Sequence, residues 1–80
     1  MNNEVYKDYL LDLIVILKEY ASEAKSNKVK SIATKDEDYN TGYLMGYHRV
    51  ISLMQQQAEG FQIPLEELGL DKIDPDRDLI

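Results

Sequence analysis

The stretch that decides the fold is Tyr9-Leu10-Leu11-Asp12-Leu13-Ile14-Val15-Ile16-Leu17, in which every residue except Asp12 is apolar or aromatic. A helix that covers one side of a core needs only about three apolar positions in seven. This helix therefore has enough apolar surface to bury two faces. A chain of 80 residues cannot supply partners for both, so the sequence predicts that a second copy covers one of them.

Length and composition favour the same interpretation. A chain of 80 residues forms one domain, and a single core of that size buries only roughly 60% of the surface of the unfolded chain. The sequence has no Cys for a disulfide or a zinc site, so oligomerisation remains as a source of stability. The apolar run is shorter than the roughly 20 residues that span a bilayer, and the N-terminus lacks the pattern of a secretion signal. We therefore expect a cytoplasmic protein without a membrane segment.

The net charge of −6 is concentrated toward the C-terminus. Residues 71–80 contain four aspartates, balanced by one lysine and one arginine. An acidic surface repels the phosphate backbone at long range, so we expect no nucleic-acid partner.

Apolar spacing predicts a first helix from about residue 3 to residue 30. Its stripe consists of Tyr6, Leu10, Leu13, Leu17, Tyr20 and Ala24, with further apolar residues on both sides. No Gly or Pro marks the end of this helix, which the sequence leaves open between Ser26 and Ala33.

A second helix is expected from about residue 35 to residue 59. Thr34 and Glu37 have the spacing of a capping box, and Gly60 is the expected stop. The predicted apolar stripe consists of Tyr43, Tyr47, Val50, Met54 and Phe61, widened by Leu44, Ile51 and Ala58.

Two further features follow the second helix. Pro64 and Gly69 bracket a short helical turn at about residues 64–68. We expect the acidic tail, residues 71–80, to be tethered across the helices by Ile73, Leu79 and Ile80, with its aspartates facing water.

The sequence thus predicts an all-α fold: an antiparallel two-helix hairpin with a short third helical turn, dimerising into a four-helix bundle. Gly42 and Gly46 lie four apart inside the second helix, where each costs about 1 kcal/mol relative to Ala. We interpret them as the place where helices pack closely. The alternative is room for a ligand against the backbone.

The most site-like set of residues is Asp12, Tyr43, Tyr47, His48 and Arg49. An acid inside an apolar run must be either exposed or paired, and these tyrosine, histidine and arginine side chains are the available partners. One His without a nucleophile or a phosphate-binding loop is a weak catalytic signal, so no catalytic residue is assigned.

The sequence contains only weak patterns for binding a metal or a cofactor. Asp74, Asp76 and Asp78 resemble the start of a calcium loop, but the Gly and the final Glu of that loop are missing. Glu19 and Glu23 have a spacing that could hold magnesium, although an isolated pair of this kind is common. We expect neither a metal nor a cofactor.

Two functions remain open. The sequence favours a non-enzymatic homodimeric interaction or adaptor module, whose partner is first of all itself. The alternative is a small-ligand or metal-dependent enzyme with its site at the dimer seam, around Asp12, Tyr43, Tyr47 and His48.

Overall fold

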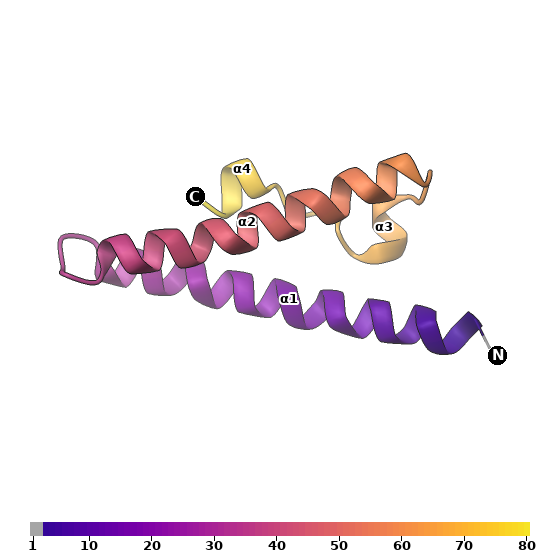
Figure 1. The fold of residues 1–80 in the computed structure, drawn as a ribbon, viewed down its shortest axis with the longest axis horizontal. Helices are drawn as coiled ribbons and strands as arrows, with labels where there is room; N and C mark the ends of the chain where they lie inside the picture. Colours follow the sequence, from indigo (N-terminus) through magenta and orange to yellow (C-terminus); the bar gives the residue numbers. More distant parts are fainter. Residues whose placement is uncertain (1–2) are drawn as a thin grey trace.

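In a computed structural model, which describes residues 3–80, the chain is an antiparallel helical hairpin with a return segment along one side (Figure 1). Its elements are α1 (Asn3–Ser31), α2 (Glu37–Gly60), α3 (Leu65–Leu68) and α4 (Pro75–Asp78). Helices α1 and α2 pack together along their length, and the described residues contain no strand. The predicted all-α hairpin is confirmed.

The connection between the long helices differs from the predicted capping box. α2 begins at Glu37, and its N-cap, Asp36, makes no side-chain capping bond. The Glu37 carboxylate instead accepts a hydrogen bond of 2.9 Å from the amide of Ala33, whose φ of 65° is left-handed. The Thr34 hydroxyl accepts from the amide of Asp36 at 3.2 Å and donates to the carbonyl of Ser31 at 2.6 Å. Thr34 and Glu37 therefore shape the turn between the helices rather than cap each other.

Helix α2 ends at Gly60, but Gly60 does not adopt the left-handed conformation that we expected of it. That conformation falls on Gln62, with a φ of 59°, and the amide of Ile63 then reaches the carbonyl of Ala58 at 2.8 Å. At the end of α3 the left-handed residue is Gly69, with a φ of 71°, as predicted. A glycine is suited to this conformation because it has no Cβ, whereas Gln62 adopts it at some cost.

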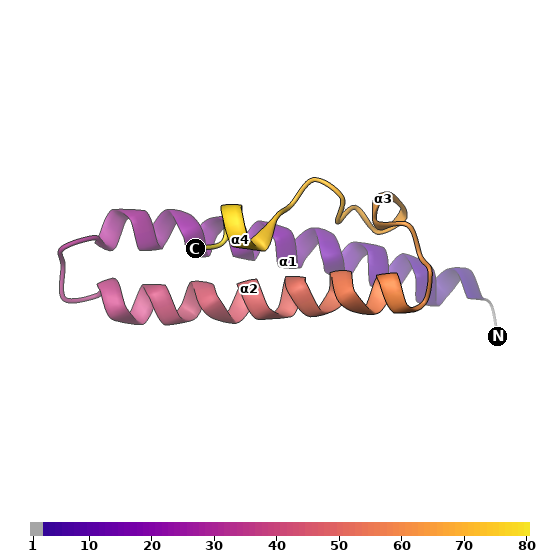
Figure 2. The ribbon, with the colours of Figure 1, turned by 90° about the horizontal axis from the view of Figure 1, so that it is seen from above.

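Residues 61–80, here called the strap, turn back along the hairpin and end in its part nearer the loop between α1 and α2 (Figure 2). Leu70 and Leu79, which are 0% and 2% exposed, anchor the strap in the core. The buried core cluster consists of Ile14, Ala21, Ala24, Leu44, Ile51, Leu70 and Leu79. The strap thus completes a core that the two long helices alone would leave open.

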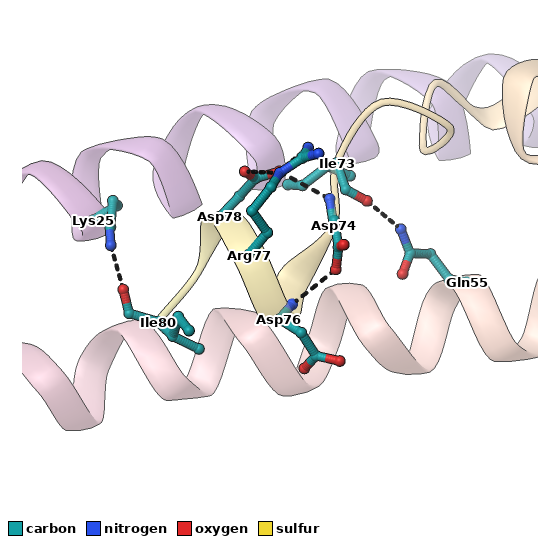
Figure 3. A network of polar contacts seen from close by, with 8 residues as sticks. All are labelled: Lys25, Gln55, Ile73, Asp74, Asp76, Arg77, Asp78 and Ile80. Atoms are coloured by element: carbon teal, nitrogen blue, oxygen red, sulfur yellow. Dashed lines mark hydrogen bonds and ion pairs between the residues drawn. The ribbon is translucent and has the colours of Figure 1, made fainter.

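Polar contacts from both long helices hold the strap in place. From α1, the Lys18 ammonium donates to the carbonyl of Gly69 at 2.6 Å, and Lys25 donates to the carbonyl of Ile80. From α2, the side-chain amide of Gln55 donates to the carbonyl of Leu70 at 3.1 Å. It also donates to the carbonyl of Ile73 at 2.8 Å, as Figure 3 shows. These bonds satisfy backbone carbonyls that the single-turn helices leave without helical partners.

Helix α4 is a single helical turn within the tail, where the sequence predicted no helix. Asp74 is its N-cap and accepts a bond of 3.1 Å from the amide of Asp76, while Pro75 is buried at the first helical position. The Asp78 carboxylate closes the turn by accepting from the amide of Asp74 at 2.9 Å and by pairing with Arg77. Aspartate at the N-cap and proline after it are a common helix start, so the local sequence explains this turn.

The tail prediction is confirmed in part. Leu79 is buried and Ile73 is half-buried, so both tether the strap to the hairpin. Ile80 is 49% exposed, because the chain reaches α1 there through its backbone carbonyl rather than its side chain. Asp71, Asp74 and Asp76 are exposed, and Asp78 is half-buried.

Candidate functional site: the open face of the hairpin

The strap covers one side of α1, and its hydrogen bonds show which side that is. Lys18 and Lys25 bond to it, so they mark the strap side of the helix. In an α-helix, a residue five positions earlier lies about 140° away around the axis. Leu13 stands in that relation to Lys18. Tyr20 stands in the same relation to Lys25, so both apolar residues lie on the side of α1 away from the strap.

The same relation holds on α2. His48 contacts the Asp76 carboxylate of α4 at 2.8 Å, and Gln55 bonds to the strap backbone. Tyr43 and Val50 lie five positions before these residues, about 140° around the helix. These four apolar residues, two on each long helix, therefore share the side of the hairpin away from residues 69–80 of the strap.

We call this side the open face. On α1 it comprises Tyr6, Tyr9, Leu13, Ile16 and Tyr20; at and beyond α2 it comprises Tyr39, Tyr43, Val50 and Phe61. Seven of these nine residues are among the exposed large hydrophobic residues, and Leu13 and Ile16 are half-buried. Of the eleven residues in the two predicted apolar stripes, six are exposed: Tyr6, Leu10, Tyr20, Tyr43, Val50 and Phe61.

The open face has an apolar half and a loop half. In the apolar half, Leu10 of α1 faces Met54 and Phe61 across a groove of about 180 Å³. The groove is further lined by Ile14, Gln57, Ala58, Ile63 and Leu68. The loop half, near residues 32–36, is more polar, because Glu23, Asn27 and Asn40 accompany its tyrosines.

Tyrosines dominate the loop half. The rings of Tyr39 and Tyr43 are stacked with centroids 6.1 Å apart, and Tyr43 and Tyr47 lie 5.5 Å apart in a tilted pair. A side-chain hydrogen bond with Tyr43, followed by burial, raises the pKa of Tyr47 from its ordinary value near 10 to about 12. The Tyr47 phenol therefore stays neutral throughout the physiological pH range.

The structure separates the residues predicted as one site. Tyr43 and Tyr47 lie together, whereas His48 and Arg49 line a separate depression beside the strap, where His48 contacts Asp76. Asp12 is exposed, which answers how an acid fits into the apolar run of α1. Within one copy, these five residues therefore form no common pocket.

The glycines of α2 do not bring the two helices of one hairpin together. Gly42 and Gly46 are exposed, and a Cβ added to either would meet nothing within 4 Å. The prediction that the hairpin helices cross there is wrong, because Leu44 and Ile51 are the α2 residues in the shared core. Gly46 lies four positions before Val50, next to the open face, and so close packing against a second copy stays a prediction.

Sequence reasoning missed two parts of the site. The pairing of Tyr20 with Tyr39 and Tyr43 depends on the register of the hairpin, which no local pattern specifies. The polar side of the strap depends on Lys18 and Gln55, whose bonds span 51 and at most 18 residues in sequence. Only the unusual number of tyrosines, six in 80 residues, hinted at the first of these.

Comparisons with models of protein families, with curated proteins and with solved structures find no match for this chain. Among residues 3–80, no group of three or more His, Asp and Glu side chains is arranged to hold a metal ion. No helix in the described part of the chain is long and apolar enough to cross a membrane. Function is therefore inferred from the two faces of the hairpin.

Proposed function

We propose that this chain is a non-enzymatic interaction module that acts as a homodimer, in which the open faces of two hairpins pack into a four-helix bundle. The observation that carries the proposal is the apolar surface shared by two adjacent helices. Soluble monomers rarely expose a contiguous apolar patch larger than a few hundred Å². Antiparallel helix pairs that each present one apolar face are the usual halves of a four-helix bundle.

The apolar half of the open face can support a small interface. It is two helices wide, at about 10 Å per helix, and half as long as the 24-residue α2, about 18 Å, so it covers roughly 360 Å². Two copies would together bury roughly 700 Å², which lies below standard stable interfaces and in the range of weak, transient ones. Aromatic residues, which make up much of this face, are enriched in such interfaces.

A second copy is the occupant that fits best. The apolar half of the open face consists of uncharged side chains: Tyr6, Tyr9, Leu13, Ile16, Val50 and Phe61. A two-fold axis places such a surface against itself without bringing like charges together. The proposed seam is therefore this apolar half of each copy.

Two matched substitutions test the proposal. Val50→Glu places a charge in the proposed seam, whereas Val15→Glu places the same charge about 140° around α1 from Tyr20, away from the open face. Both valines are surface residues, 41% and 53% exposed, so both variants should fold. Light scattering coupled to size exclusion should give a dimer for the wild type and Val15→Glu, and a monomer for Val50→Glu. A wild-type monomer, or a dimer that survives Val50→Glu, would refute the proposed seam.

The alternative of an enzyme at the seam has less support. It would join Asp12, Tyr43, Tyr47 and His48 in one site, but His48 contacts Asp76 on the strap side of α2. Tyr43 lies about 140° around the same helix, on the open face. A dimer formed through the open faces would therefore leave His48 outside its seam.

A further inference from the structure

The loop half of the open face contains a depression of about 340 Å³ between α1 and α2. Its walls are Tyr20, Glu23, Ala24 and Asn27 from α1, and Tyr39, Asn40 and Tyr43 from α2. All of these residues belong to one copy and lie outside the seam proposed above. The depression thus combines three aromatic rings with one acidic side chain, and its walls include no basic residue.

This lining suits a cation that is both flat and rich in hydrogen-bond donors. The faces of tyrosine rings attract cations, and the Glu23 carboxylate adds a full negative charge at the same site. The side-chain amides of Asn27 and Asn40 offer oxygens that can accept hydrogen bonds. A quaternary ammonium group could use the rings but would leave these acceptors without donors.

A guanidinium group uses every part of the lining. It is planar, stacks on aromatic rings, and carries five N–H donors that match a carboxylate in a bidentate pair. The Tyr39 ring, 71% exposed, stands at the rim where an incoming plane could stack on it. A lysine ammonium, as a compact and strongly hydrated charge, gains less from such a surface.

We propose that this tyrosine pocket binds the guanidinium group of an arginine side chain that a partner protein presents. This proposal depends on the proposed function in one respect only: an interaction module would take its ligand from another protein. It does not rest on self-association, because one copy supplies the whole lining.

The test is a titration of the full chain, followed by NMR, with the peptide acetyl-Gly-Arg-Gly-amide. Signals of Asn27, Asn40 and the pocket tyrosines should shift with saturation. The same peptide with citrulline, the neutral isostere of arginine, should bind at least about tenfold more weakly, which corresponds to about 1.4 kcal/mol. A peptide with lysine should fall between the two. Equal responses to arginine and citrulline, or no response to arginine, would overturn the proposal.

Matched variants locate the binding. Glu23→Gln and Tyr39→Leu should each weaken arginine-peptide binding severalfold. The control for the charge change, Glu19→Gln, makes the same substitution at an exposed position outside the pocket and should bind like the wild type. Loss of binding in this control as well would place the arginine elsewhere and overturn the proposal.

Two further measurements separate this proposal from others. Free L-arginine should bind no more tightly than the peptide, and a preference of tenfold or more for the free amino acid would mean that the ligand is not a protein. Sedimentation of the same samples gives the oligomeric state independently. A monomer that binds the arginine peptide would refute the proposed dimer alone, whereas a dimer that ignores the peptide would refute the pocket alone.

Discussion

Both faces of the hairpin carry apolar residues, but the strap covers one face and leaves the other exposed. On the strap side, Leu70 and Leu79 enter the core, and Lys18 and Gln55 bond to the strap backbone. On the open face, an apolar surface of comparable length faces outward, with Phe61 74% exposed. The last quarter of this short chain thus covers one side of the hairpin and leaves the other side exposed.

The largest effect should separate a strap anchor from an open-face leucine. Leu70→Ala removes a side chain that is 0% exposed, so it should lower the free energy of unfolding by about 2 to 5 kcal/mol. Leu10→Ala, in the groove of the apolar half and at a position 38% exposed, should weaken self-association more than it weakens the fold of the single chain. Urea unfolding at several protein concentrations distinguishes these effects, because only a change in self-association depends on concentration. Equal losses at both positions, independent of concentration, would erase the proposed difference between the faces.

A polar contact should give the next largest effect. Gln55→Ala leaves the carbonyls of Leu70 and Ile73 without their side-chain donor, so it should cost about 1 to 3 kcal/mol. Gln56→Ala, at the exposed neighbouring position, is the matched control and should be close to neutral. Amide exchange in the strap should accelerate in the first variant alone. Similar exchange in both variants would mean that Gln55 does not hold the strap.

Substitutions of Gly46, which lies next to the open face, test whether that face is uncovered within one copy. Since a Cβ at Gly46 meets nothing within one copy, Gly46→Ala should stabilise α2 by about 1 kcal/mol through helix propensity. Gly46→Leu places a larger group next to the proposed seam and should weaken the dimer if a second copy packs closely there. Thermal melts of the alanine variant and sedimentation of the leucine variant check the two effects. An alanine variant that melts lower than wild type at low concentration would show that the position is not open.

The smallest effect concerns pH. The Arg77 guanidinium, followed by the amide of Asp74, lowers the pKa of Asp78 from 3.8 to about 2. The carboxylate is therefore favoured in the folded strap, and its stabilising effect is present above pH 4 and lost as the pH falls toward 2. Wild type should melt slightly above Asp78→Asn at pH 6, with the difference vanishing near pH 2. A difference that persists unchanged at pH 2 would contradict the role of Asp78.

The positions of the helices in the sequence could be predicted better than the side that each helix turns toward the core. Local signals marked the helices, because residues such as Pro64 and Gly69 act through their own backbone geometry. Which side of α1 enters the core was not predictable, since the run from Tyr9 to Leu17 is apolar almost all the way round. The anchors Leu70 and Leu79 decide the question from far along the chain.

The sequence indicated that the candidate site is an apolar surface, but it did not indicate which residues lie together in it. The surplus of apolar residues on α1 correctly indicated an outward apolar surface, while Asp12, His48 and Arg49 were grouped by residue type alone. His48 lies on the strap side, where it hydrogen-bonds to Asp76. No local sequence pattern predicts this contact, because the two residues are 28 positions apart. Tertiary register, rather than local propensity, thus decides which side chains share a pocket.

Sedimentation equilibrium of the unmodified chain tests the central claim most directly, namely that a second copy covers the open face. At micromolar concentration the account predicts twice the chain mass of 9.3 kDa, falling toward the single-chain mass on dilution. A mass that stays at 9.3 kDa up to high micromolar concentration would contradict the claim.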